Sequence, residues 1–398
     1  MAVVQSKKTR NGWAPVSGVN LLLGIILLVS AWITILQNYE SEPTKGSLLD
    51  LVSPSVAAAA SSEAVSASSF TDARWDEGRW KPVDCAFFMK EVQKGHIVED
   101  PNKGQLMAKY TQENAVPFWI NVHNGKYDAP RLAVWETGKY YEQSLSAVFS
   151  KILDAAPANA RVIDVGGNIG WFSMLSAAHG HHVDVFEPNK VNVLRQCQSK
   201  WLNGWPTASE GEIVSRKVKK SSLNIRAYGV SDQEKETGTM YFGGNPGMGS
   251  FVNTKEFVPA NRNVTQLSDI PMIMLDSMAT ELGWLKNPIR IAILKIDIEG
   301  FEPPTVKGAL NLLSSGMVEN VLMEMTSRWD NTENQQMLSS IVDAGFVLFM
   351  IGKSNGPTST DVPETNAELP EKMMKKCASK PRQQCNFWWK HKSLDGIK

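Results

Sequence analysis

The sequence predicts an α/β fold in which a mostly parallel sheet carries helices on both faces, preceded by a single transmembrane helix. Three observations support this prediction. From residue 161 onward, short segments rich in Val, Ile and Leu alternate with segments of helical periodicity, as in a parallel sheet wrapped by helices. The strand segments are apolar throughout, as sheets buried on both faces require. An uninterrupted apolar run also lies near the start of the chain.

This apolar run, residues 19–37, has the length of a membrane-spanning helix. Lys and Arg precede it and Glu follows it, so the positive-inside rule places residues 1–18 in the cytosol. We therefore expect a single-pass type II membrane protein of the secretory pathway, and the short span favours the Golgi. A cleaved signal peptide is less favoured because its core is only about 7 to 15 residues long. A buried soluble helix is disfavoured by the polar flanks.

Composition divides the rest of the chain into four parts. Residues 38–73 are rich in Ser and Ala without a sustained period, which is typical of a solvated stem. Aromatic and aliphatic residues become dense further on, where a folded lumenal domain is expected. Its predicted parts are an N-terminal lobe at 74–138, a core at 139–350 and a C-terminal extension at 351–398.

Two short segments of the N-terminal lobe resemble strands. They are PFWINV from Pro117 and RLAVW from Arg131, and they flank an Asn-Gly turn signal. After Gly138, apolar residues recur at spacings of three and four, which predicts a helix that buries one face. In the C-terminal extension, the FWWK run from Phe387 is expected to pack against the core, with stacking on a sugar as the alternative.

The overall charge of the chain does not indicate any class of binding partner. Forty-one Lys and Arg balance forty-one Asp and Glu. No long-range field would attract nucleic acid, and we expect no nucleic-acid partner.

A glycine-rich turn follows the first core strand, in VIDVGGNIGW from Val162. Gly166 and Gly167 let the backbone turn tightly and come close to a ligand, and Gly170 lets the next helix approach the sheet. Asn168 occupies the place of the second glycine in the dinucleotide pattern. The turn therefore favours a nucleoside ligand over a pyrophosphate, which disfavours nicotinamide cofactors.

Acidic residues surround this turn. Glu187 ends the next strand, where an acid in this architecture binds the two hydroxyls of an adenosine ribose. Asp164, before the turn, is placed to hold the amino acid end of a ligand by way of the loop. Asp232, at the end of the third strand, is placed either to contact an adenine amino group or to bond its own backbone in a turn.

Several motifs in this order resemble the FkbM-type methyltransferase family, a branch of the class I S-adenosylmethionine-dependent enzymes. They are VIDVGGNIGWFS, VFEPN, AYGVSD, MLDS, LKIDIEGFEPPTVKGA and ENVLMEM, and they cover about half of the chain. The resemblance implies a Rossmann-like sheet, S-adenosyl-L-methionine as cofactor, and methyl transfer to a hydroxyl oxygen. It also implies that Asp164, Gly166, Asn168, Gly170 and Glu187 bind the cofactor. Trp171, the pair Pro303 and Pro304, and two long insertions depart from the family pattern.

A second charged cluster lies on the fourth strand. Lys295, Asp297 and Glu299 alternate with apolar residues, so their side chains emerge on one side near the carboxyl end of the strand, where open α/β sheets bind ligands. Mutual pairing of these charges is the structural interpretation. The catalytic hypothesis makes Asp297, or else Glu299, the base that takes a hydroxyl proton, with Lys295 as its orienting partner.

Two further acids have alternative interpretations. Asp276 is expected to cap the helix that follows it rather than to contact an acceptor. Glu324 either lines the ligand pocket or forms an ordinary polar strand end.

The remaining signals concern the compartment. Lumenal oxidation is expected to pair Cys377 with Cys385, or one of them with Cys85, while Cys197 fits a helical core position. Asn263 begins an NVT acceptor sequence for an N-glycan. The histidines near residue 180 precede a strand, at the sheet edge opposite to the ligand, and no metal site is expected.

Together these observations predict an O-methyltransferase that uses S-adenosyl-L-methionine. The expected acceptor is a hydroxyl of a glycan, a glycoside or a small natural product. A nicotinamide-dependent oxidoreductase or epimerase, and a methyltransferase-like binding protein without activity, are the alternatives.

Overall fold

The computed structural model describes the chain in segments, all of which lie in the unit Ala67–Lys398. The described residues are 81–87, 105–106, 115–123, 129–136, 139–158, 160–215, 221–234, 237–242, 249–252, 265–325, 332–351 and 385–394. The predicted cytosolic tail, membrane span and stem lie outside them, as do Asn263 and Cys377. Within the described segments, no helix has the length and apolar character that crossing a membrane requires.

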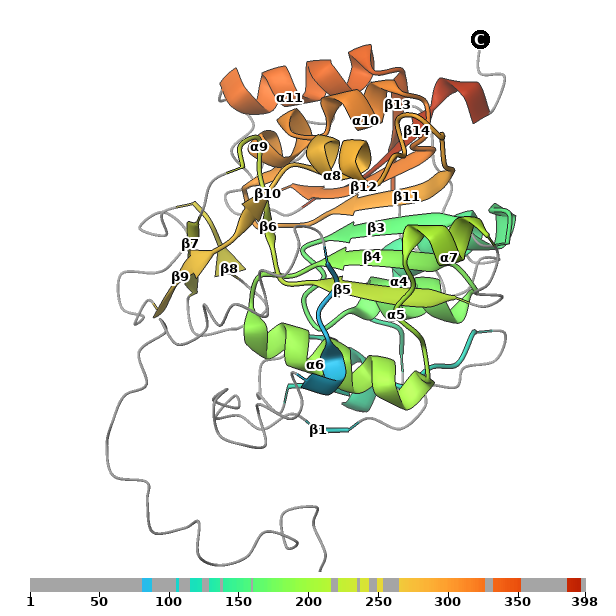
Figure 1. Ribbon diagram of the computed structural model, residues 1–398, viewed down its shortest axis with the longest axis vertical. Helices are drawn as coiled ribbons and strands as arrows, with labels where there is room; N and C mark the ends of the chain where they lie inside the picture. Colours follow the sequence, from blue (N-terminus) through green and yellow to red (C-terminus); the bar gives the residue numbers. More distant parts are fainter. Residues whose placement is uncertain are drawn as a thin grey trace, which may run out of the picture. The chain divides into compact units, whose positions relative to one another are not determined.

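A seven-stranded sheet forms the centre of the domain (Figure 1), in the order β13-β14-β12-β11-β3-β4-β5. Its strands are β3 (Arg161–Val165), β4 (His182–Phe186), β5 (Ser222–Arg226), β11 (Ile291–Ile296), β12 (Asn320–Met325), β13 (Phe346–Met350) and β14 (Cys385–His391). Pairing is parallel from β12 to β5, whereas β14 runs antiparallel to both of its neighbours. The predicted mostly parallel sheet is therefore present.

The C-terminal segment contributes an inner strand, β14, to the seven-stranded sheet. Predicted as part of an extension, residues 385–391 instead lie between β12 and β13. Successive tryptophans of this strand point to opposite faces, and each joins a different core cluster, Trp388 one and Trp389 the other. The FWWK run thus packs into the core, as the preferred interpretation expected.

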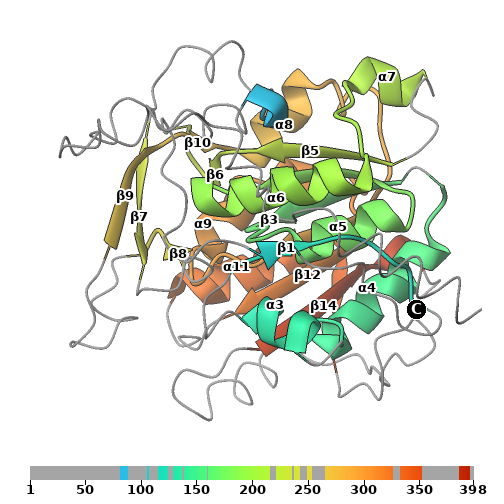
Figure 2. The same ribbon diagram turned by 90° about the horizontal axis from the view of Figure 1, so that it is seen from below.

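Helices cover both faces of the sheet (Figure 2). One face carries α4 (Gln143–Ala155), α5 (Trp171–Ala178) and α6 (Lys190–Asn203), whose apolar residues form one cluster with the sheet. The other face carries α8 (Leu275–Glu281), α10 (Leu310–Ser314) and α11 (Thr332–Asp343) in a second cluster, beside α9 (Glu302–Lys307). A short helix α7 (Glu210–Val214) begins with a capping box. This layering matches the predicted helices on both faces.

Smaller strand groups flank the central sheet. An antiparallel sheet consists of β7 (Gly238–Phe242), β8 (Gly249–Ser250) and β9 (Thr265–Ile270), in the order β8-β7-β9. It is joined to the loop after β11 because the Ser250 hydroxyl donates to the Glu299 carbonyl oxygen over 2.7 Å. Two-stranded pairs are formed by β6 (Gly229–Val230) with β10 (Met272–Ile273), and by β1 (Gln105–Leu106) with β2 (Asn121–Val122).

The N-terminal lobe differs from its prediction. PFWINV contributes the short strand β2, but RLAVW forms helical turns, α3 (Ala129–Arg131) and a π-helical segment (Leu132–Glu136). Pro130 and Val134, four residues apart, are both buried, so one helical face supplies the apolar contacts that the alternation had suggested for a strand. The strand prediction for this segment is wrong.

One disulfide joins the start of the described chain to α6. Cys85 is bonded to Cys197 across 112 residues of sequence. Cys197 is fully buried in the core on α6, as its helical pattern predicted, and its disulfide to Cys85 was not among the pairings that the sequence suggested. Cys385 is also disulfide-bonded, while the Cys377 that was expected to pair with it lies outside the described residues.

Candidate active site

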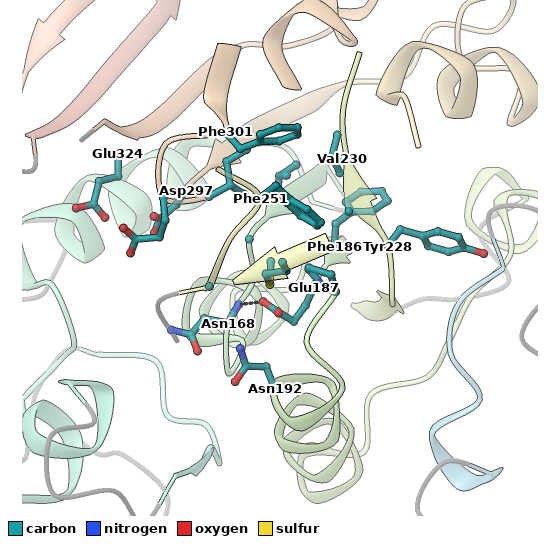
Figure 3. Close-up of a pocket in the computed structure, with 18 of the residues that line it drawn as sticks. Asn168, Phe186, Glu187, Asn192, Tyr228, Val230, Phe251, Asp297, Phe301 and Glu324 are labelled. Carbon is teal, nitrogen blue, oxygen red and sulfur yellow. Dashed lines mark hydrogen bonds between the residues drawn. The ribbon is translucent and has the colours of Figure 1, made fainter. Parts of the chain in front are cut away.

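A cavity lies at the carboxyl ends of the central strands. It is lined by residues that follow β3, β4 and β11, and by Glu324 of β12 (Figure 3). Strands β4 and β11 lie on opposite sides of β3, so the cavity is at the point where the strand order reverses. Open α/β sheets bind their ligands at this point.

The glycine turn shapes the floor of the cavity. Gly166 lies in the left-handed region, at φ +80°, and a Cβ there would lie 1.8 Å from the Asp297 carbonyl oxygen. At Gly167 a Cβ would lie 2.2 Å from a methyl group of Val185. The sequence interpretation reserved this space for a ligand, but the loop after β11 and the side chain of Val185 take it up. Gly166 still lines the cavity, and Gly170 precedes α5 at φ +90°.

Glu187 marks one end of the cavity, which we call the ribose end. Its carboxylate accepts from the Asn168 backbone N–H over 2.7 Å and from the Asn189 backbone N–H over 2.8 Å. Burial raises the pKa of Glu187 to about 7, against the opposing effect of these hydrogen bonds. The amide oxygen of Asn168, whose φ is +50°, is buried without a hydrogen-bond partner. Aromatic and aliphatic walls adjoin this end, made by Phe186, Tyr228, Val230 and Phe251.

The opposite end, which we call the acidic end, combines carboxyl groups from separate elements. Asp297 follows β11, Glu324 belongs to β12, and Glu142 precedes α4, with Tyr141 beside it. The carboxyls of Asp297 and Glu324 lie close together (Figure 3) and are hydrogen-bonded to each other. Such a bond requires one of the two carboxyls to hold a proton.

Lys295 lies beneath the acidic end. Its Nζ atom is 3.0 Å from Asp297 Oδ2 and 3.6 Å from Asp164 Oδ1, and it stands 5.2 Å from the ring centre of Phe172. Burial alone would lower the pKa of Lys295, but the surrounding carboxylates together raise it above its usual value. Lys295 is therefore charged, and it pairs with the carboxylates of Asp297 and Asp164.

The other carboxyls of this end hold protons more readily than usual. Burial, and then the charge of Asp297, raise the pKa of Glu324 to about 10. The same two causes raise the pKa of Glu142 to about 7, against the opposing charge of Lys295. The acidic end thus contains a protonated Glu324 and a Glu142 close to its titration point at neutral pH.

Several predicted site residues lie elsewhere than expected. Asp164 is buried, accepts from the Ser173 hydroxyl over 2.6 Å, and is not among the cavity-lining residues. Asp232 is also absent from that lining and pairs instead with Lys307 over 2.8 Å. Glu299 does line the cavity, at φ +54°. The structure therefore unites Asp297, Glu299 and Glu187 in one cavity, with Lys295 buried beneath the acidic end.

The two acids left open by the sequence are also placed. Glu324 lines the cavity rather than forming an ordinary strand end. Asp276 accepts from the backbone N–H groups of Asn311 and Leu312, so it bonds the start of α10 instead of capping its own helix α8. The predicted cap is wrong because α10 packs against α8 and presents its unpaired N–H groups to this carboxylate.

Sequence reasoning missed Glu142 and Tyr141. An acidic residue at the start of a helix is expected from the helix dipole alone, so no sequence pattern singled out Glu142. Its backbone adopts φ +44°, and it makes no side-chain cap bond. Glu142, Asn168 and Glu299 all line the cavity in the left-handed conformation, and strained residues of this kind cluster at functional sites.

The sheet order and the cavity define an α/β domain that binds a nucleoside-containing ligand at its strand ends. Residues 164–348, a little under half of the chain, match the family model described as the methyltransferase FkbM domain. This part of the chain belongs to that family of S-adenosylmethionine-dependent methyltransferases. No curated protein sequence matches the chain.

Solved structures with similarity to the chain include three methyltransferases. A putative SAM-dependent methyltransferase from Streptococcus mutans shares 10% identity at a TM-score of 0.33, over 74% of this chain and 56% of its own. A SAM-dependent methyltransferase from Agrobacterium tumefaciens shares 8% sequence identity at a TM-score of 0.34, over 73% of this chain and 72% of its own. A putative methyltransferase complexed with SAH shares 10% sequence identity at a TM-score of 0.33, over 74% of this chain and 57% of its own. The chain thus spans little more than half of two of these proteins, and similarities of this size carry no statement about its activity.

The residues of the cavity fit S-adenosylmethionine. Glu187 offers carboxylate oxygens to ribose hydroxyls, and the buried Asn168 amide oxygen lacks a partner that a ligand could supply. The carboxyl groups of the acidic end suit a ligand that carries positive charge. These features agree with the cofactor of the family.

Proposed function

We propose that this chain is an S-adenosylmethionine-dependent O-methyltransferase that methylates a hydroxyl group of a glycan or glycoside. The observation that carries the proposal is the place of Asp297, whose carboxylate lines the cavity at the end away from Glu187 and pairs with the buried Lys295 over 3.0 Å. A hydroxyl is a poor nucleophile until it loses its proton. A carboxylate positioned to take that proton contributes on the order of 100- to 10,000-fold in rate.

Each residue then has a defined task. S-Adenosylmethionine, when bound, supplies a methyl group on a sulfonium. Asp297 accepts the proton of the acceptor hydroxyl, Lys295 holds Asp297 in place, and Glu299 orients the acceptor. Glu187 binds the ribose hydroxyls through its carboxylate. The glycine turn fixes the distance between these two ends.

We further propose that the domain works in the lumen of the secretory pathway, anchored by residues 19–37. The disulfide between Cys85 and Cys197 supports an oxidising compartment, because such bonds are rare in proteins of the cytosol. The NVT sequence at Asn263 provides a test. Glycosidase treatment should shift the mobility of the wild-type chain but not of Asn263→Gln, and an unshifted wild type would contradict lumenal placement.

The activity is tested with S-adenosylmethionine that carries a labelled methyl group. The full-length chain is incubated with a mixture of glycans and small glycosides, and label in the acceptors is measured after hydrolysis. We expect base-stable label from the wild type and a loss of about 100-fold or more in Asp297→Asn. Label in carboxyl esters or amines, or equal label from both chains, would contradict the proposal.

A further inference from the structure

Glu142 lies outside the family-matched segment, yet it lines the same cavity. Its Oε2 atom is buried and has no hydrogen-bond partner, while its carboxyl is hydrogen-bonded to the side chain of Tyr141. A carboxylate before a helix normally accepts from the first backbone N–H groups, but Glu142 makes no such bond. The Glu142 side chain can therefore contact a ligand in the cavity, and its Oε2 atom can accept a hydrogen bond from that ligand.

The carboxyl groups of the acidic end favour the binding of a further cation. Lys295 is already shared between Asp297 and Asp164, at 3.0 and 3.6 Å. The carboxyl of Glu324 is hydrogen-bonded to the carboxyl of Asp297. Glu142 faces Lys295 and Asp297 from β11 and its loop, Glu324 from β12, and Tyr141 from its own segment. The charge of Lys295 lowers the pKa of Glu142, but burial and the charge of Asp297 outweigh it. A positively charged ligand at this position would therefore stabilise the ionised form of Glu142 further.

The orientation of S-adenosylmethionine in the cavity indicates which of its positively charged groups would reach Glu142. Glu187 and the aromatic walls place the adenosine at the ribose end. The amino acid part of the same molecule must then extend past Gly166 to the acidic end. Asp164, the sequence-based candidate for this part, is buried beneath Lys295 and bonded to Ser173.

We propose that Glu142 binds the α-ammonium group of S-adenosylmethionine through Oε2 and so fixes the amino acid end of the cofactor. This inference rests on the proposed function for the identity of the cofactor. Glu142 is then a cofactor-binding residue supplied from outside the matched domain, and Tyr141 orients its carboxylate.

The test compares two ligands that differ only in the ammonium group. Isothermal titration calorimetry measures the binding of S-adenosylhomocysteine, and of its deaminated analogue in which hydrogen replaces that group, to the full-length chain in detergent. We expect Glu142→Gln to weaken S-adenosylhomocysteine by roughly 10- to 100-fold, the value of a hydrogen bond between charged groups. The affinity for the deaminated analogue should change less than about threefold.

Glu187→Gln is the matched control, because both ligands carry the ribose. It should weaken the two ligands by similar factors. If Glu142→Gln weakens both ligands equally, or neither, the inference is overturned while the proposed cofactor stands. If the wild-type chain binds neither ligand, the proposed function itself fails and the inference fails with it.

A second measurement needs no variant and remains informative if Glu142→Gln does not fold. As the pH falls from 8 to 5.5, Glu142 takes up a proton and can no longer pair with the ammonium group. The preference of the wild-type chain for S-adenosylhomocysteine over the deaminated analogue should therefore fall by about tenfold or more. A preference that is constant over this range overturns the inference.

Discussion

The two ends of the cavity are built in different ways. At the ribose end, Glu187 accepts hydrogen bonds from backbone groups only 2 and 19 residues away, within one strand–turn–helix unit and the strand that follows it. At the acidic end, Glu142, Asp297 and Glu324 come from three elements distant in sequence and are held around one buried lysine. Local backbone geometry thus creates the first end, whereas only the packing of the sheet creates the second. Four predictions test this difference.

The largest expected effect concerns the support of the ribose end. Helix α6, whose Asn192 lines the cavity, is bonded through Cys197 to Cys85 across 112 residues. Replacing both cysteines by Ala removes a constraint worth about 4–5 kcal/mol in the free energy of unfolding by the chain-entropy model. Urea unfolding of the two chains measures this difference. A loss below about 1 kcal/mol would mean that α6 holds its place without the bond.

The acidic end should depend most on Lys295. Lys295→Met leaves the buried Asp164 and the half-buried Asp297 without a compensating charge, so the free energy of unfolding should fall by about 3–5 kcal/mol. Lys307→Met is the matched control, because that lysine is 70% exposed and pairs with Asp232 at the surface. It should change the free energy of unfolding little, because a surface ion pair is screened by water. Equal losses in the two variants would refute the central role of Lys295.

Gly166 joins the two ends. In Gly166→Ala, the new methyl group meets the Asp297 carbonyl oxygen in a backbone conformation that favours glycine. We expect a loss of about 2–4 kcal/mol in the free energy of unfolding, together with weaker binding of S-adenosylhomocysteine. Gly211→Ala serves as control because a Cβ there meets nothing within 4 Å, and it should change stability by less than about 0.5 kcal/mol. Wild-type stability in Gly166→Ala would show that the loop after β11 can move away.

The smallest effect is the pH dependence of Glu187. Burial raises its pKa from 4.5 to about 7, so the folded state binds the proton more tightly than the unfolded state does. Its contribution to stability is fully present below pH 4.5 and is lost as the pH rises through 7. Between pH 5 and 7.5, the free energy of unfolding of the wild type should fall by about 1–3 kcal/mol relative to Glu187→Gln. Parallel pH profiles for the two chains would contradict this prediction.

Prediction from the sequence succeeded where contacts are local. The central strands β3, β4, β11, β12 and β13, the helix after Gly138 and the turn that carries Gly166 follow from periodicity and turn chemistry, which act over a few residues. The strands β7, β8 and β9 were not predicted. Prediction failed for RLAVW, where alternating apolar residues fit either a strand or a short helix. It also missed the disulfide between Cys85 and Cys197, because sequence alone does not determine which cysteine of a folded chain comes within bonding distance of another.

The sequence by itself determined the α/β class, the glycine turn and Glu187, since these depend on backbone conformation and on order along the chain. Tertiary structure alone decided that β14 enters the sheet, that Asp164 is buried, and that Glu142 reaches the cavity beside Asp297. The physical reason is that burial and charge pairing depend on which distant segments the folded sheet brings together. Side-chain roles at the acidic end are therefore set by neighbours that no local pattern encodes.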